Sequence, residues 1–294
     1  MSLLPVFVAD ADDFRSGRLN WDVLNSAAAH ERVLPGLIDL SARRFLRPYS
    51  IACLCAIGAR TEKRCKLVPP KDAKCNEHLA RLGVYDWFTL QGSTPSVDER
   101  ETNIVVEHLE DRPGSSADTV IDLLLRDQTI SAGEAPILKT HLDEMIRNAL
   151  CHSESKVGCF VAGQLFPKTG RLELAIVDLG CTIPGHLCKN PKYAAIKPRD
   201  AVVVATQNGV TGTVGLNRWK EPNSGAGLHS LRSFCESGRG ELSIVSGPCI
   251  AVFHPNEVPL AKPFRGGFAG CLVNIRFFLN LGLRPAVESD RAIW

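Results

Sequence analysis

A polar segment at residues 89–103 most constrains the fold, because the hydrophobic pattern changes across it. The segment, TLQGSTPSVDERETN, carries the Gly, Ser, Thr and Pro that are typical of a linker. Before it, apolar runs alternate as strand, helix, strand and helix. After it, helical periodicity gives way to runs of strand type. The pattern predicts two domains, at residues 1–100 and 101–294.

The first domain is predicted to be a small α/β unit. Strands are expected at 37–41 and at 65–70, where two prolines end the second strand. Helices are expected at 47–63 and at 76–83, where Gly83 ends the second helix and an aromatic cluster follows. A strand–helix–strand order implies a right-handed crossover, so the two strands should pair in parallel.

The second domain is predicted to be α+β, with helices packed on one face of a mixed sheet. Helices are expected at 115–127, opened by a serine cap, and at 131–153, opened by the capping-box pair Ser131 and Glu134. Strands are expected at 104–110, 156–166, 171–180, 240–247, 249–255 and 270–278, and further helical segments at 198–209 and 227–238.

The composition is that of an ordinary globular chain of 294 residues, with 34 basic and 32 acidic side chains. This balance does not indicate nucleic acid or a membrane as a partner. The N-terminal sequence lacks the basic region of a secretory signal, and no apolar stretch reaches the roughly 18 residues that span a membrane. The eleven cysteines are scattered singly, which favours reduced thiols and a cytoplasmic location.

Three polar motifs stand at the edges of elements in the second domain. In EMIRNALCHS, Glu144 and Asn148 are four residues apart, so both emerge from one helix face. In DLGCTIP, Asp178 ends an apolar strand and needs a donor, such as the amino group of a ligand; taken alone, it could equally form an Asx turn. In NSGAGLHSL, Gly225 and Gly227 lead into a helix, which favours an anion cradle or only a tight turn.

Together, the three motifs resemble the boxes of the GHKL nucleotide-binding fold of gyrase, MutL-type repair proteins, heat-shock chaperones, histidine kinases and anti-sigma-factor kinases. EMIRNALCHS is similar to the N box of that family, DLGCTIP to its first glycine box and NSGAGL to its second. The strands GELSIVSG and GGFAGCLVNIRF resemble those that close the family's sheet. The resemblance covers about residues 103–279 and implies a Bergerat-type α/β sandwich.

The resemblance implies a role for each motif residue. Asn148 would hold Mg²⁺ through its side-chain oxygen, and Glu144 would orient and deprotonate the attacking water. Asp178 would accept the amino group of adenine, and Gly180 would let the chain turn close to the base. The other expected nucleotide contacts are Ile183, Gly225, Ala226, Gly227, Leu228 and Cys271.

The chain departs from the family pattern at three positions. The first glycine box ends in Thr182 in place of a glycine, Cys271 stands where many members have threonine, and Asn223 stands where many have glycine. These departures favour weaker binding or slower turnover, but they leave the expected ligands for Mg²⁺ and adenine in place.

The first domain, from LIDLS to GVYDWF, resembles the STAS-type domain of anti-sigma-factor antagonists. In those proteins a phosphorylatable serine caps the helix that follows the strand. Arg47 and Pro48 occupy about that place here, and Ser50 comes slightly later. The sequence therefore favours a docking or dimerisation domain over a phosphorylation switch.

The resemblance implies a Mg²⁺-dependent ATPase that couples its nucleotide state to an unidentified protein partner or to a second copy in a homodimer. Residues 181–224 would form a lid, whose Lys189, Lys192, Lys197, Arg199, Arg218 and Lys220 could reach the γ-phosphate or simply face solvent. The alternatives are a serine/threonine kinase of the anti-sigma-factor type and a nucleotide-gated module that binds ATP and ADP without hydrolysis. A standard histidine kinase is not expected, because His141 and His152 lie within the N-box helix itself.

Overall fold

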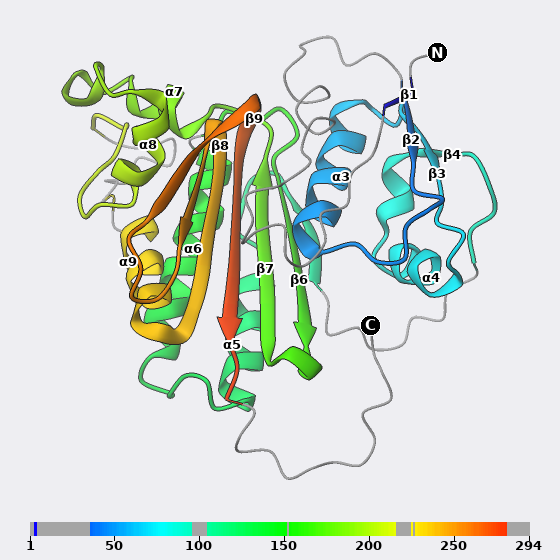
Figure 1. Cartoon of the computed structure of the whole chain (residues 1–294), viewed down its shortest axis with the longest axis horizontal. Helices are drawn as coiled ribbons and strands as arrows, with labels where there is room; N and C mark the ends of the chain where they lie inside the picture. The colour runs from blue at the N-terminus through cyan, green and yellow to red at the C-terminus, as the bar shows by residue number, and fades with distance from the viewer. Residues whose placement is uncertain are drawn as a thin grey trace.

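The computed structural model describes residues 3–4, 36–95, 105–151, 153–215, 225 and 227–280. These residues form two sheets, one in each half of the chain (Figure 1). The α+β class that the sequence predicts is confirmed at this level.

The first sheet contains four parallel strands in sequential order, β1 (Leu3–Leu4), β2 (Leu37–Asp39), β3 (Lys66–Val68) and β4 (Thr89–Leu90). Helix α3 (Pro48–Arg60) connects β2 to β3, and α4 (Ala73–Arg81) with the 3-10 turn η1 (Val84–Trp87) connects β3 to β4. The predicted parallel pairing is confirmed. The first two residues of the predicted linker are strand β4, because the backbone of Thr89 and Gln91 donates to the carbonyls of Cys65 and Leu67 beside β3.

The second sheet has the order β5-β6-β7-β9-β8 and is antiparallel between every pair of neighbouring strands. Its strands are β5 (Val105–Leu109), β6 (Cys159–Phe166), β7 (Arg171–Asp178), β8 (Gly240–Phe253) and β9 (Leu260–Phe278). The prediction of a mixed sheet is therefore wrong. Two helices, α5 (Ser116–Arg126) and α6 (Ala135–Cys151), connect β5 to β6. Because the two strands are antiparallel, β6 begins at the same end of the sheet at which β5 ends.

Strand β8 also corrects the sequence-based expectation. The strands predicted at 240–247 and 249–255 are one continuous strand, interrupted by register shifts between Ser246 and Cys249. Gly247 adopts a φ of 57° in this bulge, a conformation that glycine accepts without strain. The turn-like glycine therefore bends one strand and does not separate two.

The helices of the second half cover one face of its sheet, as predicted. Helices α5, α6 and α9 (Gly227–Phe234) pack there on a core that includes Leu172, Leu174 and Ile176 of β7. Two shorter helices, α7 (Ile183–Leu187) and α8 (Pro198–Ala205), lie beside β8 at one end of the sheet (Figure 1).

The other face of this sheet is covered by helix α3 of the first half. Alternate residues of β6 and β7, including Phe160 and Val177, join the buried residues of α3 in one hydrophobic core. Trp87 packs edge-on against Phe160 and His108 at the same junction. The two halves therefore share a core, and α3 packs against β6 and β7, the second of which ends in Asp178 (Figure 1).

Two helix starts show how local chemistry sets the position of α6 and α5. At α6 the predicted capping box forms: the Ser131 N–H donates to Glu134 at 2.9 Å, and the Glu134 N–H donates to the Ser131 hydroxyl at 3.3 Å. At α5 the predicted cap is wrong, because the Ser115 hydroxyl does not cap the helix. The carboxylate of Glu107 on β5 accepts instead from the backbone of Ser115 at 3.0 Å and of Ser116 at 3.1 Å.

No helix in the described residues combines the length and apolar character needed to cross a membrane. All eleven cysteines lie in the described part of the chain, and all are free thiols.

Candidate functional site

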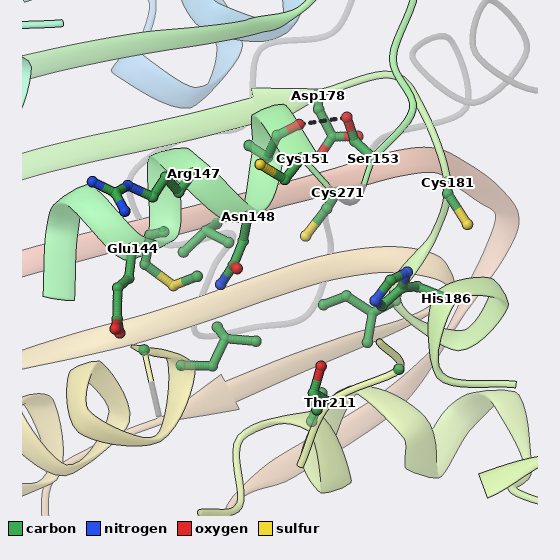
Figure 2. A pocket seen from close by; sticks show the side chains of 18 of the residues that line it. Glu144, Arg147, Asn148, Cys151, Ser153, Asp178, Cys181, His186, Thr211 and Cys271 are labelled. Carbon is green, nitrogen blue, oxygen red and sulfur yellow. Dashed lines mark hydrogen bonds between the residues drawn. The ribbon is translucent and has the colours of Figure 1, made fainter. Parts of the chain in front are cut away.

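A cavity of about 180 Å³ opens between α6, the end of β7, the middle of β9, helix α7, the loop before α9 and the start of α9 (Figure 2). It gathers residues from all three sequence motifs. The predicted residues that line it are Glu144, Asn148, Asp178, Ile183, Gly225, Gly227, Leu228 and Cys271. Ala226 and Asn223 lie outside the described residues.

The two motif residues of α6 project from the same side of the helix, as their spacing predicts (Figure 2). Asn148 points into the cavity, and no group within the described residues hydrogen-bonds to its carboxamide. Glu144, one turn earlier, points toward the start of α9. Its Oε2 is buried without a hydrogen-bond partner in the described structure, and His141 Nδ1 lies 4.0 Å away. A ligand group or a water in the cavity would supply the missing donor.

Gly227 fits closely against Glu144. A Cβ on Gly227 would lie 2.8 Å from Oε2 of Glu144 and 3.1 Å from its Cβ. Gly227 is also the first residue of α9, so the free N–H groups of that helix begin beside the carboxylate. Glycine is therefore needed here for close packing, which the sequence motif alone does not establish.

Asp178 ends β7 at the inner end of the cavity and is 3% exposed. Its Oδ1 accepts a 2.9 Å hydrogen bond from the N–H of Gly180. Burial raises the pKa of this carboxyl from 3.8 to about 8, while the backbone N–H groups of Gly180 and Cys271 oppose the rise. A further donor, such as an amino group of a ligand, would favour the ionised form.

Gly180 has a different role from the one expected for it. It does not line the cavity; a Cβ there would lie 2.0 Å from the carbonyl oxygen of Ser153. The neighbouring Cys181 N–H donates to that same carbonyl. Gly180 therefore lets the loop after β7 approach the segment after α6, and contact with a base is not needed to explain it.

Thr182, which stands where the resemblance leads us to expect a glycine, caps helix α7. Its hydroxyl accepts a hydrogen bond of 3.1 Å from the N–H of Gly185, and its φ of −73° suits a β-branched residue. The adjoining N–H of Ile183 donates at 2.8 Å to Ser246, whose hydroxyl donates in turn to Gly270 O at 2.7 Å. The departure at this position is therefore accommodated by a short helix in place of a turn.

Sequence reasoning missed several residues that line or support the cavity. His186 of α7 and the loop residues Val210, Thr211 and Gly212 line it, and His186 Nε2 lies 3.3 Å from the hydroxyl of Thr213. These residues come from an irregular stretch whose periodicity gives no signal. The buried Ser246 was detectable only as a polar residue within an apolar strand.

None of the four expected lid cations in the described residues lines the cavity. Lys189 forms an ion pair with Glu154 at 2.6 Å, and Lys192 lies 5.2 Å from the ring of Tyr193. Lys197 and Arg199 belong to the start of α8. Arg218 and Lys220 lie outside the described residues, so the expectation that a lid cation reaches a phosphate remains a prediction.

The polar residues of the cavity are compatible with a Mg²⁺ that is held mainly by phosphates. The described residues contain no cluster of three or more His, Cys, Asp or Glu that could hold a metal ion. A Mg²⁺ bound through phosphates needs only one or two protein oxygens, and Asn148 offers one. The partnerless Oε2 of Glu144 and the close approach of Gly227 are consistent with a polar ligand at this end of the cavity.

Comparison with protein-family models, with curated proteins and with solved structures found no match to this chain.

Proposed function

We propose that the second half of the chain is a GHKL-type domain that binds ATP with Mg²⁺ and hydrolyses it. The observation that carries the proposal is that Glu144, Asn148 and Asp178, which are up to 34 positions apart, line one cavity. The order of the three motifs and the glycines at the start of α9 support the same interpretation.

In this proposal Asp178 selects the base. Its carboxyl accepts the amino group of adenine, whereas guanine presents a carbonyl at the corresponding position. A donor favours the ionised carboxylate, so adenine binding releases a proton when the pKa of Asp178 is about 8. Adenine-nucleotide affinity should consequently rise as the pH rises toward 8.

Phosphates would lie at the start of α9, where the first backbone N–H groups of the helix, from Gly227 and Leu228, have no acceptor within the helix and could bind an anion. Asn148 would hold Mg²⁺, which supplies charge neutralisation between the phosphates when it is bound. Glu144 would take the proton of the attacking water, as a general base within reach of the same end of the cavity.

Incubation of the full chain with γ-labelled ATP and Mg²⁺ tests the proposed reaction. Release of free labelled phosphate supports hydrolysis. Label on the protein or on an added protein substrate would indicate a serine/threonine kinase, and intact nucleotide that remains bound would indicate a nucleotide-gated interaction module. The absence of any bound nucleotide would overturn the proposal.

A further inference from the structure

Arg60, the last residue of helix α3, reaches the loop that follows β7. Its Nη1 donates a hydrogen bond of 3.1 Å to the carbonyl oxygen of Leu179. The peptide group between Leu179 and Gly180 donates its N–H to Oδ1 of Asp178 at 2.9 Å. One peptide group thus joins a guanidinium of the first half to a carboxyl that lines the cavity of the second.

We propose that Arg60 is a positioning residue for Asp178, which it orients through the Leu179–Gly180 peptide. The first half of the chain would then contribute to base selection without touching the base. The selectivity part of this inference rests on the proposed function, whereas the effect on Asp178 does not.

The physical link is the polarisation of one amide. A cation on the carbonyl oxygen draws electrons from the peptide and makes its N–H a stronger donor. Arginine keeps its charge at every accessible pH, and its hydrogen bond to the buried Leu179 is partly shielded from water, which reduces the screening of the interaction. The Gly180 N–H opposes the burial that raises the pKa of Asp178 to about 8. Loss of Arg60 should therefore weaken this donor and raise the pKa further.

Two successive peptide groups of this loop are each held by a contact with another part of the chain. The Cys181 N–H donates to Ser153 O on the α6 side, and a Cβ on Gly180 would collide with that oxygen. On the α3 side, the hydrogen bond from Arg60 fixes the carbonyl. The same loop thus carries both an anchor to α6 and an anchor to the first half of the chain.

The groups that face Asp178 permit a clean titration. Its register neighbours are Cys159 on β6 and Cys271 on β9, and Cys181 lies in its own loop. Burial raises the pKa of all three thiols, so they stay neutral while Asp178 titrates. Glu144 on α6 and His186 on α7 line the same cavity, and both are retained in every Arg60 variant, so the comparison between variants isolates the effect of Arg60.

The test follows the Asp178 carboxyl carbon by NMR in the nucleotide-free full chain, assigned by its loss in Asp178→Asn. Arg60→Met should raise the pKa of Asp178, and Arg60→Lys, which keeps a charged donor, should hold it near the original value. Arg64→Met is the matched control, because Arg64 donates to Thr61 O at 3.1 Å near the same helix end without lining the cavity. An unchanged Asp178 pKa in Arg60→Met overturns the proposal. If that variant does not fold, Arg60→Gln is judged by the same criterion.

A second arm measures adenine-nucleotide affinity. Arg60→Met should bind about three- to tenfold more weakly at pH 7, since a rise of one in the pKa reduces the ionised fraction about tenfold. Above pH 9 the affinity of Arg60→Met for adenine nucleotide should approach that of the unmodified chain. Its turnover at saturating ATP should be unchanged at that pH. If the unmodified chain binds no nucleotide, the proposed function fails, and the titration of Asp178 still decides the role of Arg60.

Discussion

At the scale of single residues, the cavity contains two carboxyl groups in contrasting surroundings. Asp178 is almost fully buried, and its pKa is raised to about 8, whereas Glu144 retains about a third of its side-chain exposure. Paired carboxyls in different environments are suited to different tasks, one in binding and one in proton transfer. The predictions at this scale separate the two tasks.

Glu144→Ala should lower ATP turnover by at least about 10²-fold while nucleotide stays bound, because a general base contributes to the reaction and not to ground-state binding. Asn148→Ala should lose Mg²⁺-dependent binding as well. Steady-state phosphate release measures turnover in both variants, and equilibrium binding with and without Mg²⁺ measures their affinity for nucleotide. Asp143→Asn is the control, since Asp143 pairs with Lys139 at 2.8 Å and does not line the cavity. If Glu144→Ala hydrolysed ATP at the original rate, Glu144 would not be the general base, and the base would have to come from the lid.

The raised pKa of Asp178 predicts a pH-dependent stability. The folded chain keeps this proton up to about pH 8, whereas the unfolded chain releases it near pH 4. The stabilising contribution of protonated Asp178 is therefore complete below pH 4, is lost as the pH rises to 8, and is constant above it. Urea unfolding at several pH values measures this loss. As the pH rises from 4 to 8, the free energy of unfolding of the unmodified chain should fall relative to that of Asp178→Asn. A difference independent of pH would contradict the assigned burial effect.

At the scale of elements, the site depends on how closely α6 and α9 approach each other. Gly227→Ala places a methyl group 2.8 Å from Oε2 of Glu144, so the carboxylate must move or α9 must shift. We expect reduced turnover and a loss of about 1–3 kcal/mol in the free energy of unfolding. Gly133→Ala is a matched control, because nothing lies within 4 Å of its added Cβ. Phosphate release and urea unfolding measure both effects.

The same contact can be isolated by a double substitution. In a Glu144→Ala background the carboxylate that the added methyl group would meet is absent, so Gly227→Ala should there cost less of the free energy of unfolding. Equal costs in the two backgrounds would show that the backbone of α9, and not Glu144, requires the glycine.

Local sequence signals predicted the elements better than their arrangement. The Ser131–Glu134 capping box and the four-residue spacing of Glu144 and Asn148 follow from helix geometry, and both are confirmed. The order of the strands in the second sheet was not predictable, since a strand's pattern specifies its faces and not its neighbours. The packing of Gly180 against Ser153 was not predictable for the same reason, because it joins segments that sequence alone does not bring together.

At the scale of the whole molecule, helix α3 makes the two halves one packed unit. Its residues share a core with β6 and β7, and Arg47 forms an ion pair of 2.6 Å with the buried Glu173 of β7. The surface of α3 is therefore largely buried by contacts within the chain. A protein partner or a second copy would have to use other parts of the first half, or the lid.

We expect a homodimer that a non-hydrolysable ATP analogue tightens, because closure of a lid over nucleotide creates a surface for a second subunit. A ligand shifts such an equilibrium only through its differential affinity for the two states, so the analogue should have no effect on Asn148→Ala. Light scattering at micromolar concentration, with and without the analogue and Mg²⁺, measures the mass. A monomer under both conditions would exclude this coupling.

The central claim is that this cavity binds Mg²⁺–ATP and that Asp178 selects adenine. Calorimetric titration of the full chain with ATP and with GTP, in the presence of Mg²⁺, tests it most directly. We expect ATP to bind more tightly than GTP, and Asp178→Asn to weaken ATP binding by about 1–3 kcal/mol, the range for a mismatched buried polar group. Equal affinities for ATP and GTP, or no binding of either, would contradict the claim.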